Sequence, residues 1–302
     1  MDSNATYNRK SAMNVYYKVA GLPFRVSLPD GWNADALLPS LCYFRCGKCG
    51  REALIFNLDI VAEELQPIEN LEFLSESQND MGRLCLFRKE GGYYIEIGYG
   101  EGPRHKLISD STFRNAKAYI YSEDSSLKLV LSSILRIIFA QSVILNSGVS
   151  IHASCVVLHG LSYLFLGKSG TGKSTHAQQW LEAFSECMLL NDDNPVVRVE
   201  GEKVIAYGTP WSGKTPCYID AGYPVGGIVR LKQAAENKFR RLEEPENFTA
   251  LLPSCSSIRQ DEMLQDALCD TLIEIAENVS VGSMECLPER EAAVVCLNGL
   301  KN

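Results

Sequence analysis

The residues best suited to chemistry in this chain lie in a glycine-rich stretch at positions 167–175. Gly167, Gly172, Lys173 and Ser174 match a phosphate-loop pattern, in which a glycine and four further residues precede Gly-Lys-Ser or Gly-Lys-Thr. The glycines permit a tight turn whose backbone N–H groups face phosphate oxygens. The Lys173 ammonium would reach the β and γ phosphates of ATP, and the Ser174 hydroxyl is suited to Mg²⁺.

The segments on either side of the loop fit this interpretation. Residues 164–166 are apolar and predict a buried strand, and apolar residues at helical spacing predict a helix from Lys173 to about Phe184. The positive N-terminal end of that helix would favour an anion. We therefore expect ATP and Mg²⁺ to bind here, the alternative being a glycine-rich turn without a ligand. The expected nucleotide contacts are Gly167, Lys168, Ser169, Gly170, Thr171, Gly172, Lys173, Ser174 and Thr175.

Two neighbouring carboxylates come soon after the loop. Asn191, Asp192 and Asp193 follow a short apolar strand predicted at residues 187–190. Paired aspartates at a strand end beside Mg-ATP suit a general base and a metal ligand. The alternative is an exposed turn rich in Asp and Asn ahead of Pro195.

One histidine is a candidate for the same site. His152 lies on a strand predicted at residues 149–158, which leads toward the loop. A histidine satisfied within the core is the alternative at this position. The other three histidines, His105, His159 and His176, are expected to be ordinary residues of a loop, a turn and a helix.

The length and pattern of the chain predict two domains. A chain of 302 residues is long enough for two compact cores. Residues 1–125 show mostly short strands and turns, including a hairpin at 83–99, and predict a β-rich domain that would dock a substrate or partner. Residues 126–302 mix strands and helices and predict an α/β domain. Its further elements are expected as strands within 196–231 and at 279–287, and helices near 246–252, at 260–277 and from 289.

Composition narrows the possible partners and location. A net charge of −8 argues against nucleic acid as the main partner, because phosphate backbones are bound by clustered Lys and Arg. The apolar stretch at 127–145 is interrupted by Lys128, Arg136 and Gln141, so it predicts a core helix and no membrane span. The N-terminus lacks the apolar core of a secretory signal, so we expect a cytoplasmic protein whose eleven cysteines are free thiols.

Three cysteines need separate consideration. Cys42, Cys46 and Cys49 have the spacing with which radical-SAM enzymes hold a 4Fe–4S cluster. That chemistry requires a series of βα units after the triplet, whereas short strands and hairpins follow here. A zinc site would lack a clear fourth ligand nearby. Free thiols in a β-rich domain are therefore the expectation.

Residues 148–300 resemble the C-terminal catalytic domain of HPr serine kinase/phosphorylase, which shares its nucleotide site with phosphoenolpyruvate carboxykinase. The likeness rests on residues 151–153 (IHA), the loop at 167–175 and the Asp192-Asp193 pair. It is extended by 207–214 (YGTPWSGK), by 224–231 (PVGGIVRL) and by the closing strand and helix. The resemblance implies a fold class: an α/β, P-loop-containing kinase domain preceded by a smaller β-rich domain.

The resemblance also implies roles for individual residues. In that family, the positions matching His152 and Asp192 support deprotonation of an acceptor serine, and the position matching Asp193 helps to bind the metal. The expected catalytic residues are thus Asp192, His152 and Lys173, and the expected metal ligands are Ser174 and Asp193. Lys214 would contact phosphate or the acceptor, with an ordinary surface lysine as the alternative.

The expected function is that of an ATP-dependent kinase that moves the γ-phosphoryl group to a hydroxyl, with serine as the expected acceptor. The N-terminal half does not resemble that of HPr kinase, so the sequence does not decide whether the acceptor is a protein, a peptide or a small molecule. A homo-oligomer is also compatible with the sequence. A nucleotide-binding scaffold or sensor without efficient transfer is the alternative. Carboxykinase chemistry would need additional basic and metal-ligating residues that the sequence does not offer.

Overall fold

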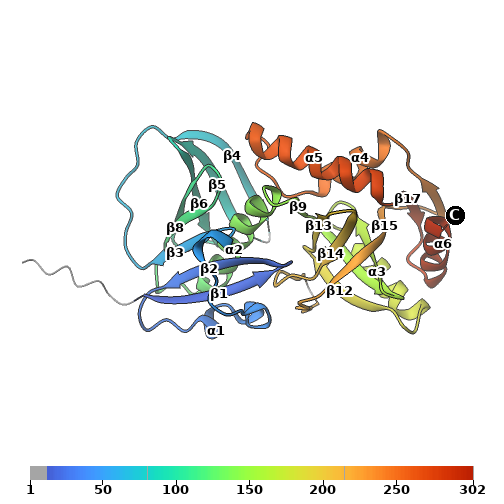
Figure 1. Ribbon diagram of the computed structural model, residues 1–302, viewed down its shortest axis with the longest axis horizontal. Helices are drawn as coiled ribbons and strands as arrows, with labels where there is room; N and C mark the ends of the chain where they lie inside the picture. The colour runs from blue at the N-terminus through green and yellow to red at the C-terminus, as the bar shows by residue number, and fades with distance from the viewer. Residues whose placement is uncertain (1–11, 80, 214, 302) are drawn as a thin grey trace, which may run out of the picture. The chain divides into compact units, whose positions relative to one another are not determined.

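The protein is described from a computed structural model, which covers residues 12–79, 81–213 and 215–301 (Figure 1). Contacts divide the chain into two compact units. The first comprises the residues up to Tyr17 and Pro23–Ile138, and the second comprises Lys18–Leu22 and the residues from Phe139 onward. The chain is a mixed α/β protein with two sheets, as the sequence predicts.

The first unit is built on an eight-stranded sheet of order β1-β2-β3-β8-β7-β6-β5-β4. The run from β8 to β4 is antiparallel, whereas β3 pairs in parallel with both β2 and β8. Short helical segments connect β2 to β3. The bounds are β1 Met13–Val19, β2 Leu22–Leu28, α1 Ala34–Leu37, η1 Pro39–Phe44, η2 Arg51–Ala53, β3 Asn57–Val61, β4 Glu72–Asn79, β5 Gly82–Lys89, β6 Gly92–Gly98, β7 His105–Asp110 and β8 Asn115–Tyr119.

The predicted hairpin is confirmed as β5 and β6, which pair antiparallel with Lys89 opposite Gly92. Gly91 has a φ of 73°, a backbone conformation that favours glycine. A Cβ on Gly92 would lie 2.0 Å from the Ser109 carbonyl oxygen, so only glycine allows β6 to approach β7 this closely. The turn glycines therefore set both the hairpin and its packing on the next strand.

The predicted core helix is present as α2 (Leu127–Ile144). Among the residues that the structure describes, α2 is the one helix long and apolar enough to cross a membrane, and 67% of its 18 residues are buried within the protein. Burial on most sides is the pattern of a helix in a protein core. The division between the two units falls inside this helix, between Ile138 and Phe139.

The second unit is built on a nine-stranded sheet. Its main path has the order β12-β10-β11-β15-β14-β13-β9, and β17 and β16 continue from β15. Strands β11, β15 and β17 are parallel neighbours, so their carboxyl ends lie on the same edge. The bounds are β9 Gly148–Ser150, β10 Ala153–Leu158, β11 Leu161–Leu166, α3 Lys173–Ala183, β12 Met188–Asp193, β13 Val196–Glu200, β14 Lys203–Tyr207, β15 Gly222–Gln233, β16 Lys238–Arg241, α4 Glu246–Leu251, η3 Leu252–Ser254, α5 Glu262–Asn278, β17 Val281–Cys286 and α6 Arg290–Lys301.

Helices α3 and α6 share one apolar core with this sheet. Trp180 of α3 is fully buried against Phe165 of β11, with ring centroids 5.3 Å apart. Met284 of β17 and Leu297 of α6 belong to the same buried cluster. Burial of large apolar side chains is the main source of stability in such a core. It fixes the start of α3 relative to the carboxyl ends of the parallel strands.

Two sequence-based expectations about strands are wrong in detail. The strand predicted at 149–158 is two strands, because His152 turns its N–H to the Ser254 carbonyl oxygen at 2.8 Å and leaves the ladder between β9 and β10. The strand predicted at 187–190 extends to Asp193, because Asp192 and Asp193 pair with Ser154 and Ala153 of β10. The aspartates are thus the last residues of β12 and do not form a turn after it.

Candidate functional site

The glycine-rich loop connects β11 to α3 and has the backbone that its glycines permit. Gly170 has a φ of 79° and Gly172 a φ of 104°, both in the region that favours glycine. Thr171 closes the turn, since its N–H and hydroxyl donate to the Lys168 carbonyl oxygen at 3.1 and 2.7 Å. At Gly167 a Cβ would lie 3.0 Å from the Thr171 side chain, so glycine is the residue that fits there.

The first turn of α3 presents donors that none of the described side chains caps. The first N–H groups of any helix lack partners within the helix, and here Gly172 occupies the cap position without a side chain. By contrast, the Asp261 side chain accepts from Leu264 N at the start of α5. Uncapped N–H groups and the helix dipole together attract an anion.

Lys173 is held under the loop by three acceptors. Its Nζ lies 2.9 Å from His152 Nε2, 3.1 Å from the Gly167 carbonyl oxygen and 3.5 Å from that of Lys168. Burial lowers the pKa of this ammonium below its ordinary value, and the carboxylates of Asp193 and Asp192 act in the opposite direction. The site therefore holds a positive charge with little contact to water, which favours exchange of these neutral acceptors for phosphate oxygens.

His152 links Lys173 to Asp193, the second of the two adjacent aspartates. Its Nδ1 lies 3.1 Å from Asp193 Oδ1. An ammonium only donates, so Nε2 must accept from Lys173 and the ring proton must sit on Nδ1, where it donates to Asp193. The structure thus brings Lys173, His152 and Asp193 together in one chain of hydrogen bonds. The histidine contacts Asp193, the residue expected to bind metal, and not the expected base Asp192.

Asp192 has a different environment from its neighbour. Ser154 lies directly opposite it in the β10–β12 ladder, and the Ser154 hydroxyl donates to Asp192 Oδ1 at 2.6 Å. Both residues are buried, with Ser154 1% and Asp192 6% exposed. A buried carboxyl group needs hydrogen bonds to replace its lost contacts with water. This bond engages one of the two carboxylate oxygens of Asp192, Oδ1.

A loop at residues 208–213 fixes the end of β12 from the other side. The amide of Asn191 donates to the Thr209 and Trp211 carbonyl oxygens at 3.3 and 3.1 Å, and its Oδ1 accepts from the backbone N–H of Asp193. Gly213 N–H donates to the Asp192 carbonyl oxygen at 3.2 Å. A Cβ on Gly213 would come within 2.6 Å of that oxygen, so glycine is required for this approach.

The expected magnesium ligands differ in exposure. The Ser174 hydroxyl is exposed in the first turn of α3, and the Asp193 side chain is 12% exposed. Among the described residues, no group of three or more His, Cys, Asp or Glu side chains could hold a metal ion by itself. Mg²⁺ usually combines one or two protein oxygens with phosphate and water, so the donor set of Ser174 and Asp193 fits it. Lys214 lies outside the residues that the structure describes.

The cysteine triplet lies in the first unit, around η1 and η2. Cys42 Sγ lies 3.2 Å from Asp35 Oδ1, and Cys49 Sγ lies 3.4 Å from the Gly47 carbonyl oxygen. Burial, followed by the Asp35 hydrogen bond, raises the pKa of the Cys42 thiol. None of the eleven cysteines, all of which the structure describes, forms a disulfide bond.

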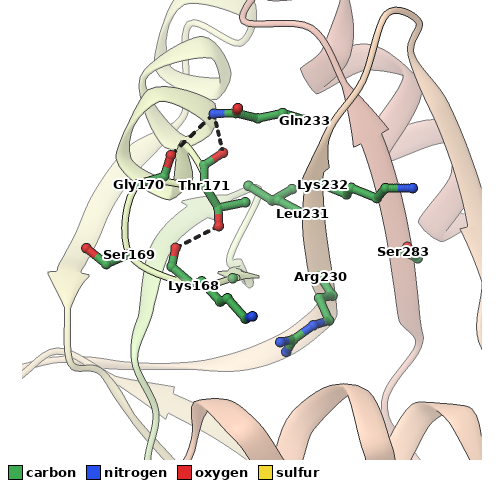
Figure 2. Close-up of a pocket in the computed structure, with 10 residues that line it drawn as sticks. Lys168, Ser169, Gly170, Thr171, Arg230, Leu231, Lys232, Gln233 and Ser283 are labelled. Atoms are coloured by element: carbon green, nitrogen blue, oxygen red, sulfur yellow. Dashed lines mark hydrogen bonds between the residues drawn. The ribbon is translucent and has the colours of Figure 1, made fainter.

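Four residues at this site could not be identified from the sequence. Ser154 carries no motif signal, and only the β10–β12 register reveals its contact with Asp192. From the sequence, Asn191 is expected after the strand, whereas in the structure its side chain holds the end of β12 against the loop at 208–213. Gln233, at the end of β15, donates to the Gly170 and Thr171 carbonyl oxygens at 3.3 and 3.4 Å. Arg230 belongs to the same strand and faces a cavity beside the loop (Figure 2).

Comparison with known proteins gives little further information. No protein-family model matches this chain, and no curated protein matches it. Among solved structures, the Hpr(Ser) kinase/phosphatase from Coxiella burnetii aligns with 51% of this chain and 94% of its own, at 12% sequence identity and a TM-score of 0.30. A likeness at this level is slight, so the function must be inferred from the residues of the site.

Proposed function

We propose that this protein is an ATP-dependent kinase that transfers the γ-phosphoryl group to a hydroxyl of a protein, a peptide or a small molecule. One observation supports this most: the buried Lys173 ammonium lies beneath a glycine-rich loop within hydrogen-bonding distance of His152, which also contacts Asp193. A cation beneath a cradle of backbone donors suits the β and γ phosphates, and a carboxylate beside it suits Mg²⁺.

In the proposed reaction, each residue of the chain has a separate task. The loop N–H groups and Lys173 bind and orient the triphosphate, while Ser174 and Asp193 are the protein ligands of Mg²⁺. The metal ion would neutralise charge on the phosphates when bound. Asp192 Oδ2 accepts the proton of the acceptor hydroxyl as its oxygen bonds to the γ phosphorus. The bond from that phosphorus to the bridging oxygen breaks, and ADP leaves with that oxygen.

The proposal is tested first by binding. Titration calorimetry with Mg-ATP should give measurable affinity for the wild type and severely weakened affinity for Lys173→Ala, because the substitution removes the charge facing two phosphates. Lys203→Ala, an exposed lysine on β14, is the matched control and should bind as the wild type does. Equal affinities for wild type and Lys173→Ala would show that the loop is not a nucleotide site.

Catalysis separates a kinase from a scaffold that only holds nucleotide. With labelled Mg-ATP and host-cell lysate, we expect label on an acceptor, and slow ATP hydrolysis can be followed until that acceptor is identified. Asp192→Asn keeps the shape of the side chain but removes the base, so ATP binding should persist while transfer falls about 10²- to 10⁴-fold. Undiminished transfer by Asp192→Asn would exclude it as the base. No transfer by the wild type would favour the scaffold.

A further inference from the structure

A cavity of about 530 Å³ lies beside the glycine-rich loop, on the side away from His152 and the two aspartates. The loop residues 167–171 form one wall. The other wall comes from the carboxyl end of β15, through Arg230, Leu231, Lys232 and Gln233, and from Ser283 within β17. The volume is within the roughly 300–1,000 Å³ of small-molecule sites. This cavity has no task in the proton transfer described above.

Strand register places the cavity relative to the reacting groups. One row of paired residues runs across five neighbouring strands, from Asp193 through Ala153, Leu166 and Arg230 to Ser283. Adjacent strands lie about 4.8 Å apart, so the strand of Asp193 is roughly 10 Å from the strand that enters the loop. Arg230 and Ser283 lie on the opposite side of that strand. The loop therefore separates the carboxylates from the cavity.

The geometry of phosphoryl transfer determines which part of ATP would lie on each side. The attacking and leaving oxygens lie roughly in line through the transferred phosphorus. If Asp192 takes the proton of the attacking hydroxyl, the acceptor enters from the β12 side of the loop. The leaving ADP must then extend in the opposite direction, toward β15 and β17.

The side chains around the cavity fit a nucleoside. Figure 2 shows Lys168 and Arg230 extending from the loop and from β15 into the space between them. Arg230 is held in place by donation to the Ala250 carbonyl oxygen at 2.8 Å, whereas Lys232 is drawn aside to Glu285 at 2.7 Å. A guanidinium is planar and stacks on aromatic rings, so a fixed Arg230 can lie against a base. The Ser283 hydroxyl can both donate and accept toward a ribose.

We propose that this cavity is the nucleoside subsite, which receives the ribose and base of ATP with the Arg230 guanidinium against the base. The proposal rests on the function proposed above and adds the direction in which the nucleotide lies across the loop. The alternative is that the phosphoryl acceptor occupies this cavity. The base of ATP would then lie on the other side of the loop.

The test compares Mg-ATP with inorganic tripolyphosphate, which offers three phosphates and no nucleoside. Titration calorimetry would use the wild type, Arg230→Gln and Ser283→Leu, with Arg240→Gln of β16 as the matched control outside the cavity. Ser283→Leu narrows the cavity without changing charge. We expect ATP affinity to fall about tenfold in both cavity variants, since base stacking is worth about 1–3 kcal/mol, while tripolyphosphate affinity changes less than twofold in Ser283→Leu.

The binding measurements on the two cavity variants decide the proposal. A loss of affinity for ATP without a similar loss for tripolyphosphate supports the nucleoside subsite. Unchanged ATP affinity in both cavity variants overturns it, and a raised KM for the acceptor in those variants would assign the cavity to the acceptor. If Ser283→Leu lowers the affinities for ATP and tripolyphosphate equally, the proposal is also overturned, because the substitution would then disturb phosphate binding by the loop. If Lys173→Ala weakens both ligands while the cavity variants weaken neither, the inference alone fails. If the wild type binds neither ligand, the proposed function fails with it.

Discussion

At the scale of single residues, the two adjacent aspartates differ in the side chains that they contact. Asp193 contacts His152, and Asp192 contacts the buried Ser154 hydroxyl. The assignment of base and metal ligand from the sequence stays a prediction, since only an assay can test it. The hydrogen bond from Ser154 suggests the further hypothesis that this residue positions the Asp192 side chain.

We predict that Ser154→Ala lowers kcat about tenfold while leaving the KM for ATP within twofold. The reason is that loss of a hydrogen bond to a buried charged group costs about 1.5–3 kcal/mol and frees Asp192 to rotate. Ser154→Thr keeps the hydroxyl and should restore most of the rate. The measurement is single-turnover transfer, with calorimetry for ATP. A lower rate in Ser154→Ala that Ser154→Thr does not recover would indicate a packing defect and no role in positioning.

At the scale of elements, periodic segments could be predicted and irregular ones could not. Apolar spacing predicts α2 and α3, and the Glu90-Gly91-Gly92 turn predicts the β5–β6 hairpin, all of which are confirmed. The end of β12 could not be predicted, because Asn and Asp have low strand propensity and are held there by the β10 ladder. The break at His152 depends on the distant Ser254 carbonyl, which local sequence does not reveal.

We predict that Gly213→Ala impairs the site through the loop that packs on β12. The added Cβ would meet the Asp192 carbonyl oxygen, so either the loop or the strand end must move. Such overpacking costs about 1–3 kcal/mol of stability, and we expect transfer to fall more than ATP affinity. Gly47→Ala is the control, because a Cβ there meets no atom within 4 Å. Full activity of Gly213→Ala would show that this contact does not position Asp192.

Helix α3 should make the stability of the second unit depend on pH. Burial lowers the pKa of His176 to about 4, and Trp180 Nε1 donates to its Nε2. The unfolded chain binds a proton near pH 6.5, so the stabilisation is fully present above that pH and is lost as pH falls toward 4. The largest loss is about 3 kcal/mol. In denaturant unfolding followed by tryptophan fluorescence, the free energy of unfolding of His176→Gln should depend less on pH than that of the wild type. The same pH dependence in both proteins would contradict this prediction.

At the scale of the whole molecule, the sequence predicts a mixed chain with a β-rich beginning but does not predict strand order. The first sheet places β3 between β2 and β8 in parallel, a pairing of segments far apart in sequence. Long-range pairing of this kind leaves no periodic signal in either segment. The order of the second sheet likewise determines which residues flank the loop, including Arg230 and Ser283.

Because every residue of the proposed nucleotide site belongs to the second unit, we predict that Mg-ATP stabilises this unit selectively. At a ligand concentration 100 times Kd, the expected gain in the free energy of unfolding is about 2.7 kcal/mol. Hydrogen exchange should slow in β10, β11 and α3 and stay unchanged in β5–β7. Lys173→Ala should abolish the effect. Equal slowing in both units would show that ligand stabilisation spreads through the whole chain.

The bond between Lys173 and His152 has one more consequence for the proposed reaction. Without phosphate, the lysine occupies the Nε2 lone pair of the ring. A triphosphate that draws the ammonium toward itself uncovers that lone pair while Nδ1 stays bonded to Asp193. Binding of the triphosphate would then also make His152 Nε2 available as a second proton acceptor. In the proposed reaction, Lys173 would therefore keep His152 from accepting a proton until a triphosphate is bound.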